Sequence, residues 1–499
     1  MARTIVATTR ENAIKLVPPT SPRRNFLRSL VYTTAGAALV RGTLFHSSAS
    51  SQHDFQSQRP APAERKFVSA GVEEKIAEVK RNIADRELAW LFENCFPNTL
   101  DTTLTFSVKN GRPDTLVITG DINAMWLRDS SAQVGPYVPL ARNDKQLKDL
   151  IAGVINRQTR CILIDRYANA FSFGANACPW GVNDKPALSP ELCERKWEID
   201  SLCYPIRLAY SYWKTSGDTS CFDSDWQQAA RLILKTFREQ QRLNDPGPYR
   251  FQRSTENPID TPPFNGLGNP TRPVGLIHAA FRPSDDACLY PFLIPANLFA
   301  MVALNQLAEM FVSIVSDRVF AGECRALAQQ ISQAVSAYGK TQSRRRGLIY
   351  AYEVDGFGNQ LLMDDANVPS LLSLPYLGCC AVNDPVYVRT RSFVLSDDNP
   401  YFFKGKAGEG TGGPHVGLNM IWPLGIIMRA LTSNDDREIL YCLRLLKQTH
   451  AGTGFMHEAF DKDDPKKFTR SWFAWANTIF GELIVKLREQ RPHLLKVEV

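Results

Sequence analysis

The sequence predicts an all-α fold in which one large domain forms a closed toroid of paired helices. Two observations lead to this prediction. A helical periodicity of apolar residues recurs from about residue 71 to residue 499, and long loops rich in Gly, Pro, Asp and Asn separate the helical stretches. Apolar residues three or four positions apart form one stripe of an amphipathic helix. Helices paired in a ring each bury that stripe and leave their loops at the rim.

The helical stretches follow one another without a linker after about residue 70 and without a recognisable sequence repeat. Strand-like pieces are few, and the clearest are residues 104–108 and 348–354. The periodicity predicts helices within residues 72–95, 144–166, 201–214, 226–243, 291–315, 322–338, 421–431, 435–450 and 471–488.

The net charge of +7 belongs to the N-terminal region alone. Residues 1–66 carry ten Lys and Arg but three Asp and Glu, which already amounts to +7, so residues 67–499 sum to about zero. Nucleic-acid binding leaves a basic footprint on the folded part of a protein. The neutral remainder therefore argues against a nucleic-acid partner.

Residues 1–66 are typical of an export signal followed by a disordered linker. Arg23-Arg24 precedes an apolar run at residues 30–40, and a Ser-, Gln- and Pro-rich stretch follows. Paired arginines before Phe26-Leu27 resemble the twin-arginine signals of exported proteins. The run is much shorter than the about 20 residues that span a bilayer. We expect a periplasmic or extracellular protein without membrane attachment, with residues 67–499 as its catalytic domain.

Six loop segments combine acidic, aromatic and basic residues as a sugar site requires. Aromatic rings cover the apolar faces of a pyranose, and carboxylate, guanidinium and imidazole groups bind its hydroxyls. Glycosidic hydrolysis needs two further carboxyls, one protonated and one ionised. A single Asp is more often a helix cap or an ion-pair partner, so the prediction depends on the number of such segments. They are residues 120–130, 197–201, 281–286, 363–367, 412–415 and 454–458, the last followed by 470–473.

Other enzyme classes leave no motif in this sequence. It contains no GxSxG, no GxxxxGK[ST] and no HExxH. The eleven cysteines are scattered without a zinc-binding spacing, so most are expected to be small core residues. Two of the seven histidines, His415 and His457, fall in candidate site loops but are not grouped as metal ligands. We expect neither a metal nor a cofactor.

Three strings resemble glycoside hydrolase family 125. Residues 120–137 read GDINAMWLRDSSAQVGPY, residues 280–287 read AFRPSDDA and residues 454–460 read GFMHEAF. The likeness extends from about residue 72 to about residue 487. It implies an (α/α)6 toroid and an exo-acting α-1,6-mannosidase that inverts configuration without a metal ion, acting on a mannose-containing oligosaccharide or N-glycan.

The resemblance also implies roles for individual residues. Asp285 corresponds to the general acid, in preference to Asp286, and Glu458 to the general base. For inversion the two carboxyls should stand about 6.5–9.5 Å apart, and the acid should have a raised pKa. Asp200 and Asp286 remain rivals for the acid role. The sugar-binding residues that the resemblance implies are Trp126, Arg128, Asp129, Arg282, His415 and His457, with Asp200 and Asp286 beside them.

Two other functions remain open at this point. A glucoamylase-like exo-α-glucosidase shares the helical toroid, and the aryl glycoside that the protein cleaves would distinguish it. A non-catalytic glycan-binding protein would keep the site without turnover. The sequence makes no prediction of oligomeric state.

Overall fold

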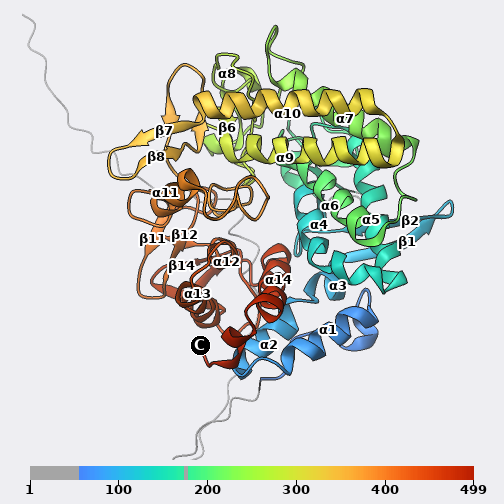
Figure 1. Cartoon of the computed structure of the whole chain (residues 1–499), viewed down its shortest axis with the longest axis vertical. Helices are drawn as coiled ribbons and strands as arrows, with labels where there is room; N and C mark the ends of the chain where they lie inside the picture. Colours follow the sequence, from blue (N-terminus) through green and yellow to red (C-terminus); the bar gives the residue numbers. More distant parts are fainter. Residues whose placement is uncertain (1–54, 173–177) are drawn as a thin grey trace, which may run out of the picture. The chain divides into compact units, whose positions relative to one another are not determined.

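The computed structural model of the protein describes residues 55–172 and 178–499. The expected export signal falls within residues 1–54, outside the described residues, and it stays a prediction. Figure 1 labels most of the helices. They are α1 Ala70–Lys80, α2 Arg86–Cys95, α3 Asn98–Thr102, α4 Leu127–Val134, α5 Lys145–Ile164, α6 Asp200–Ser216, α7 Ser224–Gln240, α8 Pro263–Gly266, α9 Ile294–Met310, α10 Arg318–Tyr338, α11 Pro385–Val394, α12 Pro423–Leu431, α13 Asp436–Thr449 and α14 Ala474–Gln490.

The helices of residues 55–499 form an (α/α)6 toroid, which confirms the predicted fold class. The inner ring contains α4, α6, α9, a series of turns at residues 372–378, α12 and α14. Neighbouring members touch, since α4 packs on α6, α6 on α9, α12 on α14, and α14 back on α4. Helices α2, α5, α7, α10, α11 and α13 form the outer layer. In Figure 1 the red α14 returns beside the blue α2 and α3, which closes the ring.

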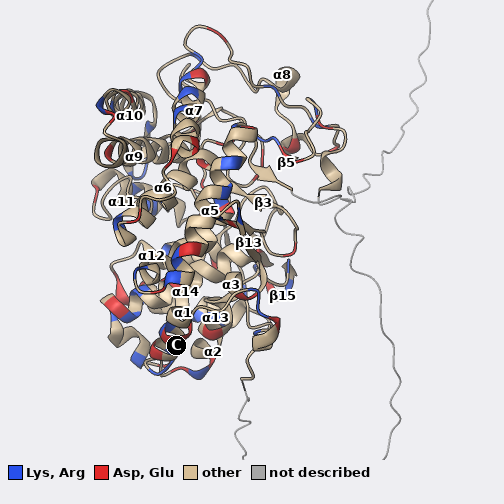
Figure 2. Ribbon diagram, turned by 90° about the vertical axis from the view of Figure 1, so that its right-hand side faces the viewer, with Lys and Arg blue, Asp and Glu red and all other residues tan. Residues whose placement is uncertain are grey.

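Burial distinguishes the two layers. Inner α12 buries eight of its nine residues, whereas outer α13 buries one face, represented by Ile439, Cys442, Leu443 and Leu446. A helix that is apolar all round is surrounded by protein, while an amphipathic one faces solvent on one side. Lys, Arg, Asp and Glu are interspersed along the described helices in Figure 2, as expected of a neutral domain.

The helix starts differ between the layers in the same way. Every outer helix begins after an Asp whose side chain accepts a hydrogen bond from a backbone N–H of the first turn. Such caps satisfy groups that would otherwise lack a partner. The inner helices α4, α6, α9, α12 and α14 have no side-chain cap. The capping residues of the outer helices are Asp85, Asp144, Asp223, Asp317, Asp384 and Asp435.

The nine predicted helical stretches are all helical, but one of them is divided and four further helices are present. Residues 72–95 divide into α1 and α2, because a turn at residues 81–85 ends α1 and Asp85 caps α2. The inner helix α4, the outer helix α11 and the short helices α3 and α8 were not predicted. Helix α4 contains Arg128, Asp129, Ser130 and Ser131 at buried positions, so it lacks the apolar stripe that the periodicity test seeks.

Strands are more numerous than the sequence predicts, although most are very short. In the described residues they form three two-stranded and three three-stranded sheets. Two-residue strands such as β3 cannot show an alternating pattern, which explains why they were missed. The strands are β1 Leu104–Lys109, β2 Arg112–Val117, β3 Met125–Trp126, β4 Ala170–Phe171, β5 Leu192–Glu194, β6 Phe292–Leu293, β7 Lys340–Ser343, β8 Gly347–Tyr350, β9 Glu353–Val354, β10 Gln360–Leu361, β11 Phe402–Lys404, β12 Glu409–Thr411, β13 Met420–Ile421, β14 Ala459–Asp461 and β15 Asp464–Thr469.

The folded domain begins at Phe55 rather than at residue 67. Residues 55–66 were expected to be a disordered linker, but Arg59 lies against the buried Asp101, with Nε 2.8 Å from Oδ2. Trp90 Nε1 donates to the carbonyl of Gln56 at 2.7 Å. A buried carboxylate needs a charged partner, and this segment supplies one for Asp101.

The α9 region is the one helical stretch among residues 55–172 and 178–499 that could cross a membrane by length and composition, Ile294–Val315. It consists of α9 and a π-helical turn, Phe311–Val315. In the toroid α9 packs against α6 on one side and α10 on the other. Its apolar composition is therefore that of an inner helix covered by its neighbours.

Candidate active site

The candidate site residues lie at the starts of the inner helices. Each inner element is entered by a loop, and each of the six loops carries one of the segments singled out from the sequence. The first turn of α4 carries Arg128 and Asp129, and the first residue of α6 is Asp200. The other loops carry Asp285 before α9, Asp365 before residues 372–378, His415 before α12, and Glu458 with Arg470 before α14.

Arg128 is the centre of a buried group of carboxylates. Its Nη1 lies 2.6 Å from Glu198 Oε2 and 3.1 Å from Asp200 Oδ2, and its Nη2 lies 3.3 Å from Asp285 Oδ1. Its Nε also lies 3.5 Å from Asp129 Oδ2. A planar guanidinium presents five donors in a fixed geometry, which suits it to organise several carboxylates at once.

Asp285 occupies a strained position with its side chain partly open to solvent. Its φ is +66°, in the left-handed region, and its N–H donates to the carbonyl of Arg282 at 2.9 Å. Its Oδ1 also accepts from Asn169 Nδ2 at 3.2 Å. The side chain is 21% exposed, whereas those of Asp286 and Asp200 are 1% and 0% exposed. Among the three acids considered for the acid role, Asp285 is the one that a substrate can reach.

The electrostatic environment of Asp285 reverses one expectation from the sequence. Burial raises the pKa of this carboxyl, but the positive charges of Arg128 and Lys196 outweigh that effect and hold the pKa below its usual range. Burial and the charge of Asp285 instead raise the pKa of Glu198 well above its ordinary value, although Arg128 opposes them. Burial likewise raises the pKa of Asp200 to about 6, against the effect of Arg128.

His415 joins the two halves of the site. Its Nδ1 lies 2.9 Å from Asp286 Oδ1, and Ser284 Oγ donates to Asp286 Oδ2 at 3.1 Å. Burial opposes the charged form of His415, but Asp286 outweighs burial and raises the pKa of the imidazole to about 9, with Glu458 and Asp285 contributing in the same direction. Both proposed catalytic carboxyls are therefore within electrostatic reach of one imidazolium.

Glu458 is paired with a cation of its own. Arg470 Nη1 lies 3.5 Å from Glu458 Oε1, and the same guanidinium pairs with Asp121 and donates to the carbonyl of Thr119 at 2.6 Å. The side chain of Glu458 is 13% exposed. A carboxylate that is partly accessible and held by an arginine can accept a proton from water.

Three predicted sugar-binding residues have other contacts. Trp126 packs beside Ala170 and Cys193. Arg282 Nε lies 2.6 Å from Glu353 Oε1, and this ion pair is buried. His457 Nδ1 donates to the carbonyl of Ser471 at 2.9 Å, and its ring stacks on Phe468 at 3.9 Å. Burial lowers the pKa of His457, so the ring is neutral at neutral pH and orients the loop of the neighbouring Glu458.

Five residues of the site were not chosen from the sequence. Glu198 stands inside the predicted segment 197–201, but Asp200 was chosen as the candidate in that segment. Arg470 stands in the predicted segment 470–473 but was assigned no role there, and the remaining three lie outside the predicted segments. The five residues are Asn169, Lys196, Glu198, Glu353 and Arg470.

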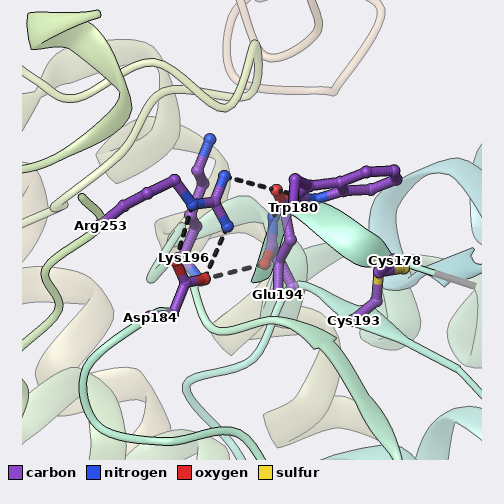
Figure 3. Close-up of a disulfide and its surroundings, with 8 residues drawn as sticks. Cys178, Trp180, Asp184, Cys193, Glu194, Lys196 and Arg253 are labelled. Atoms are coloured by element: carbon purple, nitrogen blue, oxygen red, sulfur yellow. Dashed lines mark hydrogen bonds and ion pairs between the residues drawn. A yellow bond between two sulfur atoms is a disulfide. The ribbon is translucent and has the colours of Figure 1, made fainter. Parts of the chain in front are cut away.

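A disulfide lies next to the acid side of the site. Cys178 and Cys193 are bonded with their Cα atoms 5.3 Å apart, and the other nine cysteines are free, most of them buried. Figure 3 shows the adjoining ion-pair network. Glu194, next to Cys193, accepts from Trp180 Nε1 at 2.8 Å and from Arg253 Nη1 at 3.1 Å. The prediction that most cysteines are core residues is correct, and this pairing is an addition to it.

Residues 85–485 match the family described as metal-independent alpha-mannosidase (GH125). The chain belongs to glycoside hydrolase family 125. It is 45% identical over 459 residues to the meiotically up-regulated gene 157 protein of Schizosaccharomyces pombe, a match that covers 88% of this chain and 90% of that one. The likeness noticed in the three strings is thereby confirmed.

Solved structures agree with this membership of family 125. A metal-independent alpha mannosidase of Streptococcus pneumoniae, in a non-productive complex with alpha-1,6-mannobiose, is 41% identical with a TM-score of 0.81, covering 85% of this chain and all of that one. A bacterial glucoamylase complexed with acarbose has a TM-score of 0.51 at 13% identity, covering 84% of this chain and 59% of that one. The second likeness shows the toroidal fold alone. The family 125 protein is a glycoside hydrolase of the metal-independent α-mannosidase class.

Proposed function

We propose that the protein is an exo-acting, inverting α-1,6-mannosidase that removes terminal mannose from the non-reducing end of a glycan. The observation that carries this proposal is the pair of partly exposed carboxyls, Asp285 and Glu458, held by different arginines with His415 in electrostatic contact with both. The α-1,6-mannobiose bound by the Streptococcus pneumoniae relative supports the linkage. Mannose-containing oligosaccharides or N-glycans are the proposed substrates.

In this mechanism Asp285 gives its proton to the glycosidic oxygen as the bond to the anomeric carbon breaks. Glu458 takes a proton from a water molecule that attacks that carbon from the opposite face. His415 and Arg128 provide the positive charge that faces the two carboxyls. Asp129, Asp200, Arg282 and Asp286 hold these groups in place, and Trp126 and His457 remain proposed neighbours of the terminal sugar.

The test uses α-1,6-mannobiose in the presence of a chelator, with the released anomer followed by NMR. Initial release of β-mannose, unaffected by the chelator, is expected. Asp285→Asn and Glu458→Gln should each lose activity by about 100-fold or more, because general acid or base catalysis contributes that much. Initial release of α-mannose would mean retention and a different mechanism.

A second substrate shows which of Asp285, Asp286 and Asp200 is the general acid. α-Mannosyl fluoride needs little help from an acid, since fluoride is a good leaving group, so Asp285→Asn should keep most of its activity on it. Asp286→Asn and Asp200→Asn serve as the matched comparisons. The variant of the true acid should lose activity on mannobiose but keep it on the fluoride. If Asp286→Asn or Asp200→Asn behaves in this way and Asp285→Asn does not, the substituted residue of that variant is the general acid.

The rival functions make different predictions in the same experiment. A glucoamylase-like enzyme would cleave an aryl α-glucoside in preference to the mannoside. A glycan-binding protein would bind mannobiose without turnover. Export through the twin-arginine route remains a further proposal that rests on Arg23-Arg24 and the apolar run after them. Replacing both arginines with lysine should retain the protein inside a bacterial host, and unchanged export would remove that proposal.

A further inference from the structure

Asp285 and Glu198 share their surroundings so closely that they form one acidic unit. Arg128 contacts both, through Nη2 to Asp285 Oδ1 at 3.3 Å and through Nη1 to Glu198 Oε2 at 2.6 Å. Asn169 Nδ2 also donates to both, at 3.2 Å to Asp285 Oδ1 and 3.4 Å to Glu198 Oε1. Arg128 and Asn169 together therefore hold the two carboxyl groups next to each other. A hydrogen bond between two carboxyls requires one proton, because two carboxylates offer only acceptors.

We infer that Glu198 is a positioning residue that stores the catalytic proton, which Asp285 then delivers to the leaving group. The inference rests on the proposed function. It answers a difficulty of the Asp285 site, where Arg128 and Lys196 favour the ionised carboxylate although a general acid must carry a proton. Glu198 is fully buried and Asp285 is partly exposed, so only Asp285 can touch a substrate.

The groups around Glu198 and Asp285 fit this division of roles. Tyr249 and Cys288 lie near Glu198, and because burial raises the pKa of both side chains they stay neutral and add no charge beside it. Two like charges in one buried place do not ionise together readily, as in the carboxyl pairs of aspartic proteases. The charged and titratable groups that face the pair are Arg128 and Asp129 from α4, Asp200 from α6, Lys196 from the segment before α6, and His415 from the loop before α12.

Every proton that the site gives up in one turnover is regained before the next. In the resting pair Glu198 carries the proton and donates to ionised Asp285. Binding of a sugar removes water from Asp285 and favours transfer of the proton to it. Asp285 then protonates the glycosidic oxygen while the bond to the anomeric carbon breaks, and the pair is left doubly ionised beside Arg128 and Lys196. Glu458 has meanwhile gained a proton from the attacking water, and it returns one proton to solvent as the pair takes one up.

The decisive variant is Glu198→Gln, measured on α-1,6-mannobiose and on α-mannosyl fluoride. The glutamine amide keeps a hydrogen-bond donor toward Asp285 but has no proton to transfer. We expect kcat on mannobiose to fall by about 100-fold or more, the usual contribution of general acid catalysis. Activity on the fluoride should stay within a few-fold of wild type. The alkaline limb of the mannobiose pH profile should move to lower pH, because Asp285 is then held ionised.

Glu482→Gln is the matched control. Glu482 lies in α14, and its Oε2 accepts a hydrogen bond from the Tyr376 hydroxyl at 2.9 Å. Burial raises the pKa of this carboxyl too, but the contacts that affect it are Tyr376, Arg207 and Lys486, none of them in the site. The ratio of the two activities should be unchanged in this variant.

Ser201→Ala is a milder second test that does not depend on Glu198→Gln folding. Ser201 Oγ donates to Glu198 Oε2 at 2.7 Å, which favours the ionised form of Glu198. Without this hydroxyl the pair should hold its proton more tightly, and the alkaline limb should move to higher pH. Glu198→Asp should recover part of the mannobiose activity that Glu198→Gln loses.

Three outcomes would overturn the inference. Equal losses on mannobiose and fluoride would give Glu198 a merely structural role. Full mannobiose activity with an unchanged pH profile in Glu198→Gln would mean that no proton is stored there. An alkaline limb that does not move in Ser201→Ala would contradict the shared proton. Failure of the wild-type protein to cleave either substrate would instead refute the proposed function, so the two failures are distinguishable.

Discussion

At the scale of single residues, the site is organised by cations placed between carboxyls. Arg128 contacts Asp285, Arg470 contacts Glu458, and the charge of His415 is influenced by Asp286 and by both of these proposed catalytic carboxyls. Arg128 stays charged at all working pH values, whereas the charge of His415 depends on pH. His415 therefore makes the stability of the site sensitive to alkaline conditions.

The pH dependence of His415 has a definite sign. Its folded-state pKa of about 9 lies above the value of about 6.5 in an unfolded chain. The stability that it contributes is fully present below pH 6.5 and is lost as the pH rises through 9, amounting to about 3 kcal/mol. The free energy of unfolding of wild type minus that of His415→Gln should therefore shrink by about this amount between pH 6 and pH 10.

An NMR titration of the His415 ring checks the same prediction directly. The expected midpoint lies near pH 9 in the wild type and falls in Asp286→Asn, because the neighbouring carboxylate is then gone. A midpoint below pH 7 in the wild type would contradict the account of this site.

At the scale of elements, the loop that carries Glu458 is fixed at its start by a glycine. Gly454 has φ +77°, and a Cβ there would lie 2.8 Å from Trp90 Cζ2 and from Asn94 Nδ2. Gly452 also has a positive φ of +81°, but a Cβ there would meet nothing within 4 Å. An alanine at either position would adopt a strained backbone conformation, but only an alanine at Gly454 would also collide with other side chains. A comparison of the two substitutions therefore distinguishes the destabilisation caused by backbone strain from that caused by crowding.

Gly454→Ala should destabilise the protein by about 3 kcal/mol, since it combines left-handed strain with overpacking. It should also lower kcat by moving Glu458, four residues further along. Gly452→Ala should cost about 1 kcal/mol and leave kcat almost unchanged. Chemical denaturation and assays on α-mannosyl fluoride measure both effects, and equal behaviour of the two variants would disprove the role of crowding.

Helices with an apolar stripe could be predicted from the sequence, and those without one could not. Outer helices such as α5 and α10 alternate between buried and exposed faces, so their periodicity is clear. Helix α4 buries charged residues of the site, and α11 is short and follows Asp384-Pro385. The Asp that precedes each outer helix was a usable signal for both α2 and α11.

The same distinction applies to the site. Asp285, Glu458 and Arg128 stand in strings long enough to be noticed. Glu198 and Lys196 matter because the fold brings them to Asp285 from 87 and 89 positions away, and no local pattern shows that. The predicted direction of the Asp285 pKa was wrong for this reason, since no local pattern shows that Arg128 and Lys196 lie beside this carboxyl.

At the scale of the whole molecule, residues 55–66 are part of the folded domain. Arg59 and Asp101 form a pair whose side chains are 5% and 2% exposed, and Phe55 packs on Trp90 with ring centroids 5.3 Å apart. Loss of one partner of a buried ion pair is strongly destabilising because the other charge is left uncompensated.

Two shortened proteins test this boundary. A protein that begins at Phe55 should keep the unfolding free energy of the full chain, whereas one that begins at Phe67 should lose about 3–5 kcal/mol. Arg59→Met in the longer protein should reproduce most of that loss. Denaturant titration measures the unfolding free energy of the two shortened proteins and of Arg59→Met. Equal stability of the two shortened proteins would mean that residues 55–66 are only a linker.

The site draws on the six loops that enter the inner elements, from Thr119 to Arg470, and α14 closes the ring only afterwards. During synthesis the ribosome releases Asp285 long before Glu458, and α14 is the last long helix to emerge. A growing chain therefore has no catalytic centre until nearly its whole length is available. The appearance of activity therefore reports that α14 has been made, and a protein cut short by a premature stop before α14 should have no activity.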